Sequence, residues 1–131
     1  DLPGRGRVQS VPGGTHWGGG VSISARDQVR VGKLVLDGGL VDGRQLISRE
    51  WLREMTEPCP IAPFDGRLLW LNRDQQAFPG VSRDAVFMLG AGGHFVWIDP
   101  TLDAVVVLRW LDPQHANGII GQFSEALAAS A

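Results

Sequence analysis

The stretch from Asp84 to Trp110 contains three short β-forming segments in succession, and it constrains the fold more than any other part of the sequence. The segments cover residues 85–89, 94–98 and 104–110, and they are rich in the β-branched and aromatic residues that favour strands. None of them alternates strictly between apolar and polar residues, so we expect strands that are covered on both faces. Because only short turns separate the segments, they are predicted to form an antiparallel meander.

The first turn of this meander is the cluster Gly90-Ala91-Gly92-Gly93, which no packed strand interior would contain. Backbone N–H groups of such a cluster can hold an anion, but the residues that follow match neither a P-loop nor a dinucleotide-binding fingerprint. The alternative interpretation is a tight hairpin turn with two extra glycines. In the second turn, Asp99 and Asp103 are interpreted as turn-forming residues and not as acid or base groups.

Two helices are predicted before the strands. The first has Ser24 as its N-cap and Asp27 in its first turn, and it should end near Asp37 at the following pair of glycines. The second has Ser48 as its N-cap and should end at the Pro-Cys-Pro of residues 58–60. In the first helix Val31, Leu34 and Val35 are expected to share one face, to which Gln28 could be added. In the second helix Trp51, Leu52 and Met55 are expected to point inward.

A fourth strand is predicted at residues 67–72 and a closing helix at about 115–129, whose buried side should carry Ile119, Ile120, Phe123 and Leu127. Helices followed by a run of strands and a last helix indicate an antiparallel α+β layer. The predicted parts are a glycine-rich loop (1–20), a helical part (21–63), antiparallel strands (64–112) and a closing helix (113–131). Because the first part could not start a domain alone, we expect this chain to be a fragment of a longer domain.

Composition excludes several classes of function. The 131 residues carry a formal net charge of −2 with basic and acidic residues interspersed, which argues against a nucleic-acid-binding stripe or a polybasic membrane patch. The single cysteine, Cys59, cannot form an internal disulfide or a cysteine-cluster metal site. No apolar run reaches membrane-spanning length and no signal peptide is recognisable, so the cytoplasm is favoured over the periplasm.

Candidate catalytic residues are few. The three histidines, His16, His94 and His115, show no metal-ligand spacing, and we expect neither a metal nor a cofactor. No serine stands in a Gly-x-Ser-x-Gly motif or three residues before a lysine, and the sequence contains no tyrosine. His16 and Trp17 lie in a glycine-rich loop, where they could line a site or anchor the loop. His94 alone is typical of a packed or solvated histidine.

Three segments together resemble one family. Residues 18–27 and 32–39 (GGGVSISARD and GKLVLDGG), residues 43–51 (GRQLISREW) and residues 90–100 (GAGGHFVWIDP) are similar, in this order, to motifs in the C-terminal third of serine β-lactamase-related hydrolases. That superfamily includes class C β-lactamases, D-alanyl-D-alanine carboxypeptidases, family VIII esterases and 6-aminohexanoate-dimer hydrolases. The resemblance implies the C-terminal portion of a β-lactamase/transpeptidase-like fold, with an antiparallel sheet and flanking helices.

The resemblance also implies a serine hydrolase that cleaves an ester or amide through an acyl-serine intermediate. The family's Ser-x-x-Lys and Tyr-x-Asn motifs are absent here, so the nucleophile is expected outside this chain, and the isolated chain is expected to be inactive. Only the third family motif has a counterpart, the glycine turn, which lacks the lysine and hydroxyl of Lys-Thr-Gly. This departure favours the esterase and amidase branches over the alternative of a β-lactamase or D-Ala-D-Ala peptidase.

Site roles follow by carrying the family pattern over to matching positions. The backbone N–H of Ala91 matches the oxyanion-hole donor of the strand, while Gly90, Gly92 and Gly93 would let substrate approach the backbone. The resemblance adds His94, which could contact the leaving group, and His16 with Trp17 near the mouth of the cleft. The expected partners are an ester or amide substrate, the missing N-terminal part of the fold and, for the isolated chain, a second copy. The remaining alternative is a non-catalytic interaction or structural module.

Overall fold

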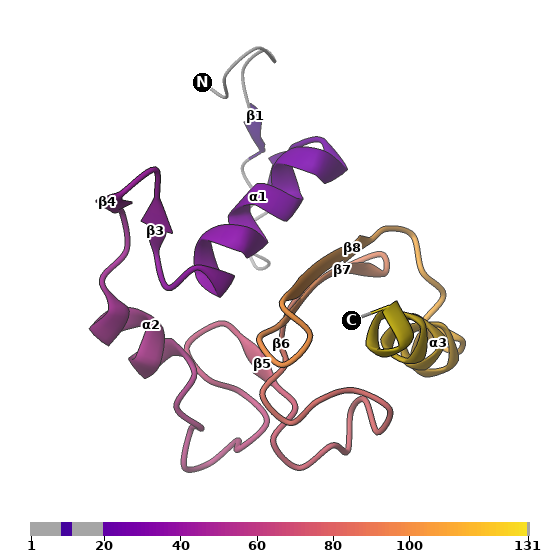
Figure 1. Ribbon diagram of the computed structural model, residues 1–131. Helices are drawn as coiled ribbons and strands as arrows, with labels where there is room; N and C mark the ends of the chain where they lie inside the picture. The colour runs from indigo at the N-terminus through magenta and orange to yellow at the C-terminus, as the bar shows by residue number, and fades with distance from the viewer. Residues whose placement is uncertain (1–8, 12–19, 131) are drawn as a thin grey trace.

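The computed structural model describes residues 9–11 and 20–130. The described residues form three helices, one four-stranded sheet and two small strand pairs (Figure 1). The elements in chain order are β1 (Gln9–Val11), β2 (Gly20–Ser22), α1 (Ala25–Leu36), β3 (Leu40–Val41), β4 (Arg44–Gln45), α2 (Arg49–Met55), β5 (Trp70–Leu71), β6 (Val86–Gly90), β7 (His94–Asp99), β8 (Ala104–Leu108) and α3 (Ala116–Ser130).

The main sheet has the strand order β5-β6-β7-β8, and every neighbouring pair is antiparallel. The predicted meander and the α+β class are therefore confirmed. Two strands are shorter than predicted. Strand β8 ends at Leu108, and β5 covers only two residues because Leu68 adopts a left-handed backbone conformation (φ 67°) that no extended strand can contain.

Helices α1 and α3 lie on opposite sides of strands β7 and β8, so the sheet is covered on both faces as predicted (Figure 1). Beneath α3 the core is largely aromatic, and beneath α1 it is aliphatic. The buried aromatic residues on the α3 side are Phe78, Phe87, Phe95 and Trp97, and the buried aliphatic residues on the α1 side are Leu69, Leu71, Val86, Val96 and Ile98.

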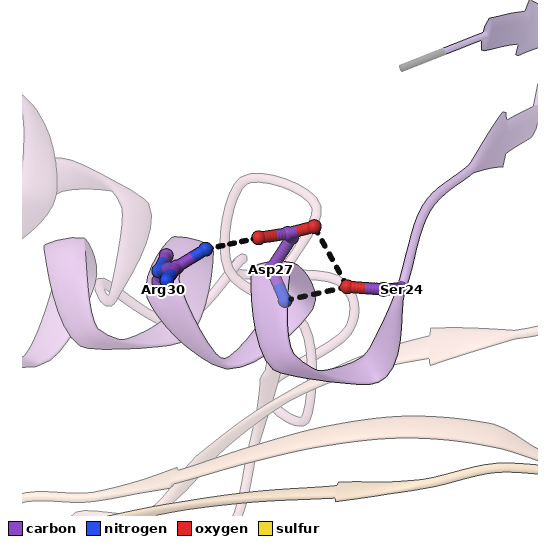
Figure 2. Close-up of polar contacts among 3 residues, drawn as sticks. All are labelled: Ser24, Asp27 and Arg30. Atoms are coloured by element: carbon purple, nitrogen blue, oxygen red, sulfur yellow. Dashed lines mark hydrogen bonds and ion pairs between the residues drawn. The ribbon is translucent and has the colours of Figure 1, made fainter. Parts of the chain in front are cut away.

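The first turn of α1 is closed by the side chain of Ser24, as predicted. The Ser24 Oγ accepts a hydrogen bond from the Asp27 backbone N–H (3.1 Å) and donates one to Asp27 Oδ2 (2.7 Å). The other carboxylate oxygen of Asp27 forms an ion pair with Arg30 (Figure 2). The carboxylate of Asp27 is buried, whereas the guanidinium of Arg30 is exposed. The hydrogen bonds and the ion pair offset the free-energy cost of burying the charged carboxylate.

The face of α1 that packs on the sheet differs from the predicted one. Val31 was expected to face the core, but 43% of it is exposed, whereas Gly32 is buried against the sheet. A Cβ atom at Gly32 would stand 2.5 Å from Val105 Cγ1 and 3.0 Å from Val96 Cγ1. The helix backbone therefore approaches the strands more closely than any side chain would allow, and the contacting face rotates away from Val31.

This close approach predicts an unusual result for a helix-favouring substitution. Gly32→Ala should lower the free energy of unfolding by about 1–3 kcal/mol, because the stiff β-branched side chain of Val105 cannot move aside cheaply. The matched control is Gly121→Ala in α3, where a Cβ meets nothing within 4 Å. It should raise the stability by about 0.5–1 kcal/mol. Chemical denaturation would measure both, and adding Val105→Ala to Gly32→Ala should recover part of the loss.

Helices α2 and α3 each expose one aromatic residue that the sequence predicted to be buried. Trp51 is 47% exposed, and its ring lies beside the guanidinium of Arg67 (5.7 Å to the ring centroid). Phe123 is 44% exposed, whereas Ile120 and Ala116 bury the inner side of α3. Both aromatic residues lie at the margin of the contacting face, where helical periodicity alone cannot separate half-buried from buried positions.

Two short strand pairs lie outside the main sheet. Strands β1 and β2 pair antiparallel, so part of the predicted loop 1–20 is extended structure. Strands β3 and β4 flank Asp42 and Gly43, both with positive φ (47° and 76°), which is the backbone of a tight hairpin turn.

The segment between β5 and β6, predicted only as a loop, is organised around the buried side chain of Asn72. Its Nδ2 donates to the carbonyl groups of Phe78 (2.9 Å), Val81 (3.2 Å) and Ser82 (3.1 Å), and its Oδ1 accepts from the Phe78 N–H (3.2 Å). Because these bonds satisfy the backbone of a buried loop, they hold Phe78 in the aromatic core.

Candidate functional site

The glycine turn connects β6 to β7, as the sequence predicted. Gly90 and His94 form the last pair of the ladder, and residues 91–93 make the turn. Gly92 and Gly93 both have positive φ (84° and 75°). Gly93 is also pressed against the chain beyond β8, because its carbonyl accepts from the Leu111 N–H (3.0 Å) and a Cβ at Gly93 would lie 2.0 Å from the Leu111 carbonyl oxygen.

Beside this turn is a cavity of about 530 Å³. Its walls come from three parts of the chain: the segment from β2 to the start of α1, the glycine turn with the start of β7, and the residues just after β8. The lining residues are Val21, Ser22, Ile23, Gln28, Gly90, Ala91, His94, Arg109 and Trp110. A second cavity of about 310 Å³ lies between α1, α2 and the sheet, and it is lined by none of the predicted site residues.

Ala91 is exposed at the edge of the larger cavity. Its backbone N–H donates to no acceptor among residues 9–11 and 20–130. A backbone donor that has no internal partner and belongs to a residue at the edge of a cavity is available to an anionic or carbonyl oxygen of a ligand. The neighbouring Gly90 also lines the cavity, whereas Gly92 and Gly93 turn the chain beside it.

His94 forms one wall of the cavity and packs on Trp110. The two rings meet edge to face, with their centroids 4.5 Å apart and an interplanar angle of 68°. The histidine is partly buried. The ring of His94 therefore packs on Trp110 and also lines the cavity, and contact with a leaving group stays a prediction.

Arg109, Gln28 and Trp110 complete the cavity, and sequence reasoning did not select any of them. The Arg109 guanidinium donates to Gln28 Oε1 (2.7 Å from Nη2 and 3.2 Å from Nε) and to the Ile23 carbonyl oxygen (2.6 Å from Nη2). These bonds tie the end of β8 to the start of α1. The sequence feature that could have identified Arg109 is its position as a charged residue in the otherwise apolar third predicted strand.

Of the other residues considered in the sequence, two lie outside the described part of the chain, and His115 and Asp99 do not line this cavity. His16 and Trp17 lie outside the described residues. His115 is far along the chain at the start of α3, where its Nδ1 lies 3.2 Å from Asp112 Oδ2. Asp99 caps the second turn, with its Oδ1 accepting from Ser82 Oγ (2.8 Å) and from the Thr101 N–H (3.0 Å), in agreement with the predicted turn-forming role.

Lys33, the single lysine of the sequence, lies on the exposed side of α1. Its Nζ donates to Asp37 Oδ1 (2.8 Å), and this hydrogen bond raises the pKa of Lys33 above its ordinary value. A lysine that acts as a general base needs the opposite shift. Lys33 is an exposed residue of the helix and does not line the cavity beside the glycine turn.

Two further findings concern the described part of the chain. No cluster of three or more His, Cys, Asp or Glu side chains there could hold a metal ion. Nor does any helix between residues 20 and 130 have the length and apolar character needed to cross a membrane.

The sequence is similar to that of a 6-aminohexanoate-dimer hydrolase from Paenarthrobacter ureafaciens, with 32% identity over 116 residues. The similarity takes in 77% of this chain and 28% of the relative, so the chain spans less than a third of the relative's length. No family model matches the sequence.

Proposed function

This chain belongs to the superfamily of serine β-lactamase-related hydrolases, and from that premise we propose that it is the part of such an enzyme that supplies the oxyanion-hole strand. The whole enzyme would cleave an ester or an amide through an acyl-serine intermediate. The strand is β6, and the donor is the backbone N–H of Ala91 in the turn that follows it.

The observation that carries the proposal is the free N–H of Ala91 at the edge of the cavity. Acyl transfer requires donors aimed at the oxygen that becomes negatively charged in the transition state. One donor in this arrangement is the N–H of the nucleophilic residue, and Ala91 would provide the other. Because the donor is a backbone group, an alanine side chain is compatible with the role.

The nucleophile and its base would come from another part of the protein. The sequence has no tyrosine and no serine three residues before its single lysine, and that lysine lies on the outer side of α1. The cavity wall at the turn carries neither the lysine nor the hydroxyl of Lys-Thr-Gly. These features favour an ester or amide substrate over a β-lactam or a D-Ala-D-Ala peptide, and the proposed chemistry needs no cofactor.

The proposal includes a partner for the sheet. Strand β8 is the last of the four strands, and within the described residues only one of its edges is paired. An open edge presents unpaired backbone groups that readily accept another strand. We propose that a strand from another part of the same protein covers this edge, and that a second copy does so when the chain is isolated.

The experiment compares the complete protein with this 131-residue chain alone. A fluorophosphonate probe should label one serine of the complete protein, and simple esters should be hydrolysed with an initial burst. The isolated chain should give neither result and should sediment as a dimer or larger species. A stoichiometric serine adduct on the isolated chain would contradict the placement of the nucleophile, and a complete protein that neither reacts nor hydrolyses esters would contradict the proposed function itself.

A further inference from the structure

Trp110 stands out among the residues at the cavity because it is large, apolar and mostly exposed. Its exposed fraction is 79%, and its backbone has a positive φ of 59°. Residues other than glycine adopt this conformation rarely, and such positions cluster at ligand-binding and catalytic sites. The backbone thus holds a large indole at the surface of the cavity in a conformation that non-glycine residues seldom adopt.

The ring of Trp110 is held from one side and open on the other. His94 meets it edge to face, and a Cβ at Gly92 would lie 3.5 Å from its Cζ3 atom. The neighbouring Arg109 is fixed by Gln28 and by the Ile23 carbonyl, so the chain that carries Trp110 is anchored to α1. A ring on an anchored backbone and in contact with His94 offers a flat apolar surface, and ordering it on binding costs less entropy than ordering a ring without these contacts.

Charge at the cavity limits what could lie on this surface. Arg109 lines the cavity, and none of its lining residues in the described part of the chain is an Asp or a Glu. A cationic ligand would therefore be repelled, although tryptophan alone binds cations well. An uncharged planar group gains offset or edge-to-face contact with the indole and needs no counter-charge.

We propose that Trp110 is a specificity-determining residue that selects substrates with an uncharged aromatic group. The inference rests on the proposed function, because it takes the cavity to be the substrate site of the hydrolase. The aromatic group would lie against the exposed side of the Trp110 ring while the carbonyl oxygen is directed to the Ala91 N–H. It could belong to the acyl part or to the leaving alcohol of an ester.

The test uses the complete enzyme and two matched pairs of esters. Hydrolysis is measured in a pH-stat from the acid that it releases. Ethyl phenylacetate is compared with ethyl butyrate, and benzyl acetate with butyl acetate. The ratio of kcat/KM for the aromatic ester to that for the aliphatic ester should be at least about tenfold in one pair. Trp110→Ala should reduce that ratio to near one, and Trp110→Phe should retain most of it. Trp51→Ala, which removes an exposed tryptophan of α2, should leave the ratio unchanged.

A binding measurement separates this inference from the proposed function. In ¹⁵N-labelled complete enzyme, the indole N–H resonance that disappears in Trp110→Phe is followed during titration with benzamide. A saturable shift of this resonance supports the aromatic site, whether or not the esters are hydrolysed. Failure to hydrolyse any of the esters would refute only the proposed function. The inference is overturned if benzamide leaves the resonance unmoved, or if the enzyme turns over the esters with a ratio that Trp110→Ala does not change.

Discussion

Replacing the Gly90–Ala91 amide by an ester should lower kcat of the complete enzyme about 10²–10³-fold, which corresponds to the loss of one oxyanion donor. The exchange removes the Ala91 N–H and leaves the side chain and the shape of the turn in place. It isolates the donor cleanly because this N–H has no acceptor among the described residues, so no internal hydrogen bond is lost with it. Turnover of a simple ester measures the effect.

Two substitutions at the same position serve as companions. Ala91→Gly keeps the donor and should change kcat little, since the side chain of Ala91 is exposed and has no role in the proposal. Ala91→Pro deletes the donor and should resemble the ester variant, provided that a thermal melt shows an intact fold, because proline also restricts the backbone. If the ester variant kept full kcat, the glycine turn would be only a hairpin connection.

Gly93→Ala is expected to destabilise the protein by about 3 kcal/mol or more, because a side chain there meets both a conformational and a steric penalty. A side chain at a φ of 75° costs about 1–2 kcal/mol by itself. In addition, the new Cβ would lie 2.0 Å from the Leu111 carbonyl oxygen, a backbone atom that can move only if the turn or the chain after β8 moves. Denaturant unfolding of the variant measures the sum.

Gly43→Ala is the matched control for this prediction. Gly43 has nearly the same φ, 76°, but a Cβ there meets nothing within 4 Å. It should therefore show the conformational cost alone, about 1–2 kcal/mol. Equal losses at the two positions would show that the contact between the glycine turn and Leu111 is not tight, and the anchoring of the turn would have to be explained in another way.

The sequence predicted the meander, the three helices and the glycine turn, because each depends on residues close together in the chain. Ser24 and Asp27 are three residues apart, and the ladder from Val86 to Ile98 is closed by a short turn. The exposed positions of Trp51 and Phe123 were missed, since helical periodicity gives a face but not its margins. At Gly32, periodicity failed because a glycine contributes no apolar side chain to the pattern and yet determines how closely α1 approaches the sheet.

The candidate site was predicted only in part for a similar reason. Ala91 and His94 lie within one motif, so the resemblance to a family pointed to them directly. Gln28 and Arg109 are 81 residues apart, and nothing in either local sequence indicates that they meet. Trp110 escaped notice because the sequence placed it at the end of a buried strand, whereas the strand ends at Leu108 and leaves the indole exposed.

The two faces of the main sheet also protect the protein against misfolding by strand slippage. Moving one strand by a single residue would exchange its two faces, since side chains alternate along a strand. In β7 this would carry Phe95 and Trp97 from beneath α3 to the side where α1 already lies within reach of Val96 through Gly32. At the position of Val96, the close approach of the α1 backbone leaves no space for an indole. Because the two cores differ in bulk, we expect a β7 strand that is shifted by one residue to pack poorly on both faces, and this disfavours the wrong register during folding.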